Sequence, residues 1–199
     1  MIIDPSTISP LSCYRLLAGT VVPRPIAFVS TVSTGGVYNL APFSFFNVVC
    51  AEPPVVAFSP TFRNPPKDTL ANVLATGEFV VNIVSEEIAA QMNVCSGEYA
   101  PDVDEFQVSR LTPVASDLVR APRVGESPVS MECRLVRIVE VSTRPLGASL
   151  VLGEVVRFHL KDGLFDGKAV DPGRLAAVGR MSGNTYAYTR DRFELVRPR

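Results

Sequence analysis

The chain has 199 residues, 47% of them hydrophobic and 20% charged, which is typical of one globular domain, here expected over residues 1–199. Its formal net charge is −1 and its pI is about 5.9, so it lacks a broad cationic surface and we expect no nucleic-acid partner. The sequence contains neither a secretory signal nor an apolar run near the roughly 18 residues of a membrane span. We therefore expect a cytoplasmic protein that makes no membrane contact.

Motifs for several common chemistries do not occur in the sequence. The four cysteines lie about forty residues apart without a C-x-x-C pair, which excludes a zinc knuckle or a redox dithiol. His159 is the only histidine, so one chain cannot build a multi-histidine metal centre. The G-x-G-x-x-G and G-x-x-x-x-G-K-[ST] fingerprints are absent too, so the usual dinucleotide and phosphate-loop folds have no support.

The start of the chain predicts a short helix followed by a β-hairpin. Ser9 is a favourable N-cap, Pro10 suits the first helical position, and Gly19 lies where the helix is expected to end. The β-branched and aromatic run 26–32 and the run 37–40 are predicted to be strands. Thr34-Gly35-Gly36 between them supplies the positive φ angles of a tight turn.

Further along the chain, strands alternate with two short helices. Strands are predicted over 43–49 and 55–59, a helix over 67–76 that stops at Gly77, a strand over 78–84 and a helix over 86–95. Prolines make 96–128 a loop that wraps the core. Apolar and polar residues alternate over 129–141 and 150–161, which predicts two long half-buried strands.

Strands thus outnumber helices in the predicted order. Such a count favours a mainly β fold with flanking helices, because a closed antiparallel arrangement removes exposed strand edges. We expect a split β-barrel, that is, a Greek-key-like antiparallel barrel.

One candidate anion site lies where the strand 55–59 passes through a proline-rich loop to a helix start. Arg63, Lys67, Asp68 and Thr69 there can bring cations, a hydroxyl and backbone N–H groups to one phosphate, and Ser59 offers a further hydroxyl. The spacing leaves a second role open for Asp68, which could instead cap the helix while Lys67 stays in solvent.

A second candidate segment is Asn39–Asn47. If the strand ends at Pro42, the backbone groups of Ala41, Pro42, Phe43 and Ser44 are free to bond a polar ring edge. An ordinary bend in a barrel strand, with the phenylalanines filling the core, remains open as the alternative.

Three segments taken together, Pro23–Thr31, Asn39–Asn47 and Lys67–Thr69, resemble the flavin reductase-like, FMN-binding split-barrel family that includes the flavoredoxins. Four later segments agree with this resemblance, which runs from about residue 10 to 190: Asp104–Phe106, Met131–Cys133, Gly153–Val156 with His159 following, and Gly179–Gly183 with Tyr186. It implies an FMN cofactor whose phosphate lies at the Arg63–Thr69 loop, in preference to the capping role for Asp68.

The resemblance also implies contacts from individual side chains. Contacts to the flavin ring and ribityl chain are implied for Arg24, Ser30, Thr31, Asn39, Ala41, Ser44 and Asn47. Arg180 and Tyr186 are expected to approach the flavin, in some relatives across a dimer interface, and His159 is a candidate contact to the flavin or nicotinamide ring. A homodimer is therefore expected.

Three functions compete on this basis. The favoured one is an NAD(P)H:flavin oxidoreductase that passes electrons to free flavin, to a monooxygenase or to another electron-transfer partner. The alternative is a flavoredoxin-like FMN carrier that does not oxidise NAD(P)H itself. A hydrolase built on Cys133 and His159 is least favoured, because both residues fall within predicted strands and no oxyanion motif accompanies them. No catalytic residue is assigned.

Overall fold

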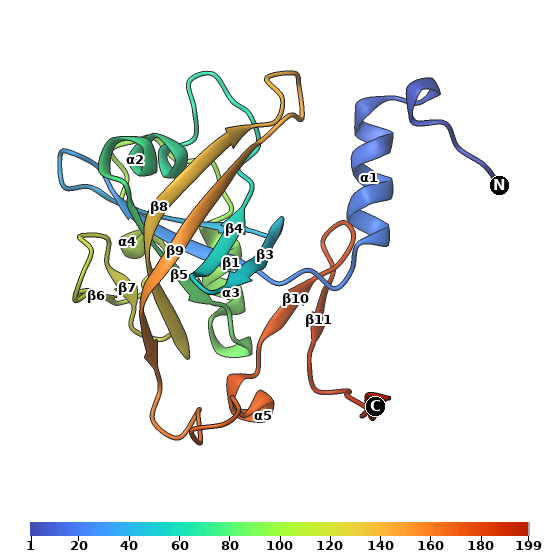
Figure 1. Ribbon diagram of the computed structural model, residues 1–199. Helices are drawn as coiled ribbons and strands as arrows, with labels where there is room; N and C mark the ends of the chain where they lie inside the picture. The colour runs from blue at the N-terminus through green and yellow to red at the C-terminus, as the bar shows by residue number, and fades with distance from the viewer. Residues whose placement is uncertain (199) are drawn as a thin grey trace.

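A computed structural model describes residues 1–198 and shows a strand-rich body with helices around it (Figure 1). The helical elements are η1 (Pro5–Thr7), α1 (Pro10–Thr20), α2 (Asp68–Thr76), η2 (Glu86–Ile88), α3 (Ala89–Val94), α4 (Glu105–Ser109) and α5 (Pro172–Leu175). The strands are β1 (Ala27–Val32), β2 (Tyr38–Phe43), β3 (Phe46–Ala51), β4 (Pro54–Phe58), β5 (Glu78–Ile83), β6 (Pro113–Val114), β7 (Arg123–Val124), β8 (Val129–Glu140), β9 (Ser149–Leu160), β10 (Val178–Arg180) and β11 (Tyr186–Tyr188).

The principal sheet is antiparallel and has seven strands in the order β2-β1-β5-β8-β9-β4-β3. Its two outermost strands, β2 and β3, are consecutive in the chain and are joined only by Ser44 and Phe45. In a flat sheet they would lie about 29 Å apart, whereas two linking residues reach only about 10 Å. The sheet therefore has to curl until its edges meet. We call the junction at Ser44 and Phe45 the seam. The Ser59 N–H donates to the Phe45 carbonyl at 2.9 Å, which extends the β3–β4 pairing one residue beyond Phe46 and Phe58.

Aromatic contacts inside the curled sheet show that it encloses a core. The Phe43 ring of β2 lies 4.9 Å from the Phe58 ring of β4, measured between centroids, and Phe58 lies 5.3 Å from Phe79 of β5. β2 and β4 are far apart in the strand order, so the first contact crosses the barrel interior. Such ring pairs stabilise the fold beyond the area that they bury.

A second layer covers the outer face of β1 and β2. Phe28 of β1 and Leu40 of β2 pack there with Ile88, Met92 and Phe106 from the η2–α4 region. Central strands are consequently buried on both faces, as the uniformly buried residues of β1 show. The far ends of β8 and β9 extend beyond the barrel as a hairpin (Figure 1).

The first helix stands beside the barrel, close to the β10–β11 hairpin (Figure 1). Ser9 caps it as expected, because the Ser9 hydroxyl oxygen accepts the Ser12 N–H at 3.1 Å. Within residues 1–198, no helix combines the length and the apolar character needed to cross a membrane.

The sequence-based prediction of a mainly β antiparallel fold is confirmed, with corrections at particular residues. α1 continues to Thr20, so Gly19 lies inside it. β2 continues through Pro42, which is paired with Phe28, because an outermost strand can accommodate a residue without an N–H. The segment 96–128 does wrap the core, but it includes α4 and the short β6–β7 ribbon.

Gly153 of β9 packs closely against two core side chains. A methyl group there would overlap the Phe79 ring, lying 2.7 Å from Cε1, and would come within 3.2 Å of Cys133 Cβ. Phe79 and Cys133 are fully buried, so neither side chain can move aside without disturbing the core. The restriction at Gly153 is therefore steric.

We expect Gly153→Ala to lower the free energy of unfolding by about 1 to 3 kcal/mol, the usual cost of overpacking a core. Urea denaturation followed by circular dichroism measures this change. Gly35→Ala is the matched control, since its methyl would lie 3.7 Å from Ser33 Oγ, in ordinary contact. Equal stability of the two variants would contradict the steric restriction.

Candidate functional site

Two cavities adjoin the seam. The large cavity has a volume of about 900 Å³ and is lined by Leu11, Tyr14, Arg15 and Ala18 of α1, by Arg24, Ile26, Pro42 and Ser44, by Met92, Asn93 and Ser96, and by Met181, Ser182, Gly183, Asn184, Arg180 and Tyr186 of the β10–β11 hairpin. The small cavity, of about 400 Å³, is lined by Leu17, Val21, Pro23, Arg24, Pro25, Ser44, Phe45, Phe46 and Asn47. Arg24 and Ser44 line both cavities.

Arg24 is only 6% exposed and joins three parts of the molecule. Its Nη1 donates to the carbonyls of Ala18 at 2.5 Å and Val21 at 2.8 Å, at the end of α1. Nη2 donates to the Met181 carbonyl at 3.0 Å, and Nε to Ser44 Oγ at 3.4 Å. All four acceptors are neutral, and among residues 1–198 no carboxylate forms an ion pair with this group. Arg24 is thus a buried cation without a protein counter-charge.

Two more arginines line the large cavity. Arg180 exchanges backbone hydrogen bonds with Arg24 at 3.0 and 2.8 Å, and its guanidinium lies 4.5 Å from the centroid of the Tyr186 ring. Arg15 reaches the cavity from the exposed surface of α1. Arg15 was not among the predicted site residues, because a single arginine on a predicted helix gives no signal until the position of the helix is known.

The outermost position of β2 gives the Asn39–Ser44 segment its free backbone groups. β2 pairs with β1 alone within the described sheet, so alternate N–H and C=O groups face away from β1. Apart from the Leu40 N–H, which donates to Glu105, these groups are free because of the edge. The expectation that the strand ends at Pro42 was wrong. Phe43 belongs to the core, as the alternative interpretation held, whereas Phe45 is 42% exposed at the seam.

A buried polar network connects β1 and β2 to α2. The Asn39 amide Nδ2 donates to Thr31 Oγ1 at 3.1 Å and to Thr69 Oγ1 at 2.9 Å. The Asn72 amide donates to the same Thr31 hydroxyl at 3.0 Å. Three residues predicted from separate segments therefore meet, and they fix the start of α2 against the edge strand.

Lys67 and Asp68 form the start of α2. Lys67 occupies the N-cap position, and no side chain in the described part of the chain caps this helix. The interpretation of Asp68 as a cap is therefore wrong. The first N–H groups of a helix have no intrahelical acceptor, so this end of α2 can bind an anion. Lys67 Nζ lies 6.0 Å from the centroid of the Phe43 ring, which places it beside the end of β2.

The remaining polar residues of this region lie around the same end of the barrel. Arg63 is half exposed and pairs with Glu98 at 3.5 Å. Ser59, half-buried, follows β4 at the seam. Asn47 is exposed on β3, and its side-chain oxygen accepts the Val48 N–H at 2.8 Å. Of these three residues, only Asn47 lines a cavity at the seam, and Arg63 and Ser59 line neither cavity.

Ser30 does not join the seam. Successive residues of a strand point to opposite faces, so Ser30 points away from the face of its neighbour Thr31. Ser30 is fully buried, its hydroxyl donates to the Pro122 carbonyl, and it accepts from Asn82 Nδ2 at 3.2 Å. The expected flavin contact from Ser30 is therefore corrected to a structural role.

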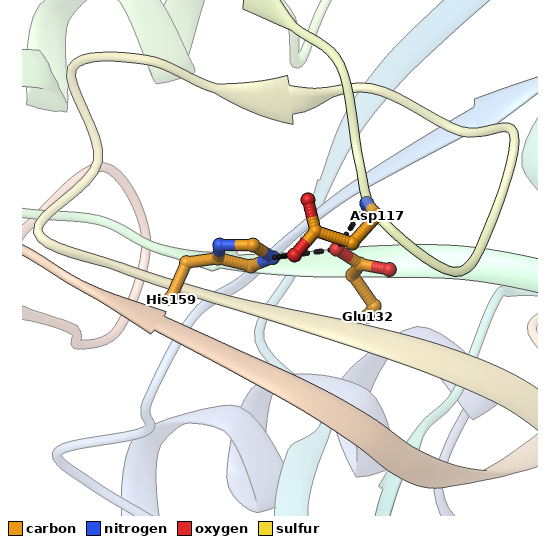
Figure 2. Close-up of side chains that lie close together, drawn as sticks. All are labelled: Asp117, Glu132 and His159. Atoms are coloured by element: carbon orange, nitrogen blue, oxygen red, sulfur yellow. Dashed lines mark hydrogen bonds and ion pairs between the residues drawn. The ribbon is translucent and has the colours of Figure 1, made fainter.

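His159 lies in neither cavity lining but beside two carboxylates, Glu132 and Asp117 (Figure 2). Its Nε2 is 2.5 Å from Glu132 Oε1 and 4.0 Å from Asp117 Oδ2. Glu132 is fully buried and also accepts the N–H groups of Asp117 at 2.8 Å and Leu118 at 2.6 Å. Burial alone would raise the pKa of Glu132, but these donors lower it on balance.

The candidate ligand atoms of His159, Glu132 and Asp117 lie within 4.8 Å of one another, a spacing at which all three could bind one metal ion. The Glu132 oxygens, however, are already occupied by three donors, and Arg157 lies 3.1 Å from the Asp117 carboxylate. The three residues therefore have a structural role: their hydrogen bonds hold the 115–122 segment against β8 and β9.

A hydrolase based on Cys133 and His159 is excluded by the same geometry. Cys133 faces the barrel core and is fully buried, and its pKa is raised far above the usual range, chiefly by burial. His159 instead lies on the outer face against Glu132. The thiol and the ring consequently do not form a nucleophile–base pair.

Glu105 is a buried carboxyl group behind β2 that sequence analysis did not select as a site residue. Its Oε2 accepts the Leu40 N–H at 3.1 Å, on the free edge of the strand. Burial, together with the nearby carboxylates of Asp68 and Asp104, raises its pKa to about 7, although hydrogen bonds from Leu40 and its own backbone oppose the shift. Glu105 thus titrates near neutral pH next to the candidate site.

Comparisons with known proteins agree with this geometry. Residues 18–194 match the family model described as flavin reductase like domain. The crystal structure of nitrilotriacetate monooxygenase component B from Bacillus cereus is 35% identical, with a TM-score of 0.94 and 98% of each chain covered. The 2-nitrobenzoate 2-nitroreductase NbaA from Pseudomonas fluorescens is 32% identical, with a TM-score of 0.91, 100% of this chain and 96% of that chain covered.

A third solved structure supports the fold alone. It comes from Shewanella frigidimarina NCIMB 400, is described as having a split barrel domain, and is 22% identical with a TM-score of 0.86 over 100% of both chains. The split-barrel prediction is confirmed.

Glu105→Gln tests the buried carboxyl group. The pKa of Glu105 is raised on folding from 4.5 to about 7, so its stabilising contribution is complete below pH 4.5 and is lost as the pH rises through 7. Glutamine can still accept the Leu40 N–H but does not ionise. Relative to wild type, we expect the variant to gain about 2 to 3 kcal/mol of unfolding free energy between pH 4.5 and pH 8.

Urea titrations at several pH values measure this difference, with Glu140→Gln, exposed on β8, as the control. Parallel pH profiles for wild type and Glu105→Gln would show that the carboxyl group is not perturbed.

Proposed function

Because the chain belongs to the flavin reductase-like domain family, we propose that it binds FMN along the seam and carries electrons from NADH or NADPH through the flavin to a further acceptor. The observation that supports this most is Arg24, a buried guanidinium at the seam without a counter-charge from residues 1–198. A cation in such a position favours an anionic ligand beside it.

The chemistry of FMN matches three surroundings at this end of the barrel. Its phosphate matches the uncapped start of α2 with Lys67, Thr69 and the more exposed Arg63. The polar edge of its ring matches the free backbone groups of the β2 edge at Ala41 and its neighbours. The flat face of the ring matches Phe45 and Pro42 at the seam. The residues present therefore fit the cofactor.

Bound FMN would supply two-electron transfer from a nicotinamide, and the protein would supply position and charge. Arg24 and Ser44 would hold the ring edge, with Arg24 offsetting negative charge on the reduced flavin. The Thr31–Asn39–Thr69 network would keep the phosphate end and the ring end at a fixed separation. The proposed site thus comprises Arg24, Thr31, Asn39, Ala41, Pro42, Ser44, Asn47, Ser59, Arg63, Lys67 and Thr69, with Asp68 beside it.

The acceptor distinguishes two forms of this function. The similarity to component B of a monooxygenase supports a partner oxygenase that receives reduced flavin. The alternative is a carrier that retains FMN and takes its electrons from another protein. Anaerobic addition of NADH or NADPH to the FMN-loaded protein decides between them: bleaching of the flavin supports the reductase, and an unchanged spectrum supports the carrier.

Lys67→Ala tests the phosphate site. A charge-assisted hydrogen bond contributes roughly 1.5 to 3 kcal/mol, so the dissociation constant for FMN should rise about ten- to a hundredfold. Riboflavin lacks the phosphate and should bind the variant and the wild type equally. Quenching of flavin fluorescence measures both affinities, with exposed Lys168→Ala as the matched control. Equal losses for FMN and riboflavin would place the phosphate elsewhere.

A homodimer is part of this proposal. β3, at the edge of the sheet, exposes Val48 and Val49 at 68% and 54%, and Phe45 precedes it at the seam. Leu17 of α1 and Val21, which follows the end of α1, are both more than half exposed. They lie with Phe45 around the small cavity and extend this apolar surface. A second copy of the chain would cover the exposed edge and the apolar side chains together.

Val48→Asp should convert the dimer to a monomer, because it places a charge in the apolar contact. Sedimentation velocity measures the change. Leu74→Asp, at a 60% exposed position on α2, is the control and should remain dimeric. A wild-type protein that is monomeric at tens of micromolar would remove the dimer from the proposal.

A further inference from the structure

We propose that the large cavity binds the pyrophosphate of the nicotinamide dinucleotide between Arg15 of α1 and Arg180 of β10. This inference rests on the proposed function, to which it adds the binding site of the hydride donor. It separates that site from the phosphate site of FMN at the start of α2.

The charge of the cavity is the first reason. Arg15, Arg24 and Arg180 all line it, and its lining includes no aspartate or glutamate from residues 1–198. Arg24 is only 6% exposed, and all of its hydrogen-bond acceptors in the protein are neutral oxygens. Three guanidinium groups that line one cavity make its electrostatic potential positive, which attracts an anionic ligand. The cavity is therefore suited to a ligand with more than one negative charge.

Position is the second reason. A hydride donor has to bring its reacting atom within about 3 to 3.5 Å of the flavin, so its site has to share a wall with the flavin site. Pro42 and Ser44, from the segment assigned to the flavin ring, also line the large cavity. Lys67 and Thr69, assigned to the FMN phosphate, do not line it. The two anion sites are therefore formed by different residues.

Size and ring surfaces distinguish a dinucleotide from a smaller anion. The volume of about 900 Å³ is near the upper end of the range for small-molecule sites, roughly 300 to 1,000 Å³. Tyr14 comes from α1 and Tyr186 from β11, so aromatic surfaces flank the arginines on two walls. A nicotinamide dinucleotide carries two ring systems on either side of a pyrophosphate. A single aromatic carboxylate would leave most of this space and one arginine unused.

Arg15→Gln and Arg180→Gln test the assignment by two measurements. NADH and NADPH are titrated into flavin-free protein and followed by nicotinamide fluorescence, and the same dinucleotides reduce FMN-loaded protein in anaerobic stopped flow. We expect the dissociation constant of the dinucleotide to rise about tenfold in each variant, with the limiting rate of reduction largely kept. The affinity for FMN should change less than about threefold.

Two variants serve as controls. Lys67→Ala should show the opposite pattern, with weakened FMN binding and unchanged dinucleotide binding. Arg134→Gln, at an exposed position of β8 outside both cavity linings, should change neither affinity. Circular dichroism of each variant verifies that the fold is kept.

Three results would overturn the inference. In the first, Arg15→Gln and Arg180→Gln weaken FMN as much as the dinucleotide, which would assign the cavity to the flavin. In the second, neither variant changes dinucleotide affinity. In the third, 2-nitrobenzoate binds in an Arg15- and Arg180-dependent manner while NADH and NADPH do not bind. Failure of wild type to bind FMN instead contradicts the proposed function, and the titration of flavin-free protein still tests the cavity.

Discussion

The two-residue connection between the outermost strands is the constraint on which the rest of the structure depends. Ser44 and Phe45 join β2 to β3, and the sheet can satisfy so short a link only by curling into a barrel. The two edges meet without pairing along their length, so backbone groups and apolar side chains remain available at the seam. Both cavities lie there, and the candidate site follows from how the barrel closes.

Arg24 connects the seam of the barrel to α1 and to the β10–β11 hairpin. Its guanidinium holds the end of α1, the β10–β11 hairpin and Ser44 through neutral acceptors. Burying a cation in this way is costly without a negative partner, and hydrogen bonds offset only part of that cost. The same residue therefore organises the walls of the large cavity and makes an anionic ligand favourable. A conservative change to lysine would keep the charge but lose the planar set of donors.

Two buried carboxyl groups show how the surroundings of a side chain determine its charge. Glu132 receives two backbone N–H groups and the His159 ring, so its pKa is lowered despite complete burial. Glu105 receives one N–H from β2 and lies near two other carboxylates, so its pKa is raised to about 7. Glu132 therefore holds the 115–122 segment through hydrogen bonds to its charged carboxylate. Glu105, beside the edge strand β2, changes its charge near neutral pH.

The sequence by itself determined most strands of the principal sheet, the helices α1 and α2, the mainly β class, the Ser9 cap and the Gly77 stop, because these depend on local periodicity, capping and turn chemistry. It did not indicate α4, α5 or the short strands β6, β7, β10 and β11. The family resemblance, carried by the segments around Arg24, Asn39 and Lys67, also came from the sequence. Only the tertiary structure decided which polar residues lie together in one site. Adjacent strand residues face opposite ways, so Thr31 joins Asn39 and Thr69 while Ser30 does not. Arg15, His159 and Glu105 acquire their roles from elements distant in the chain, and local sequence contains no information about that proximity.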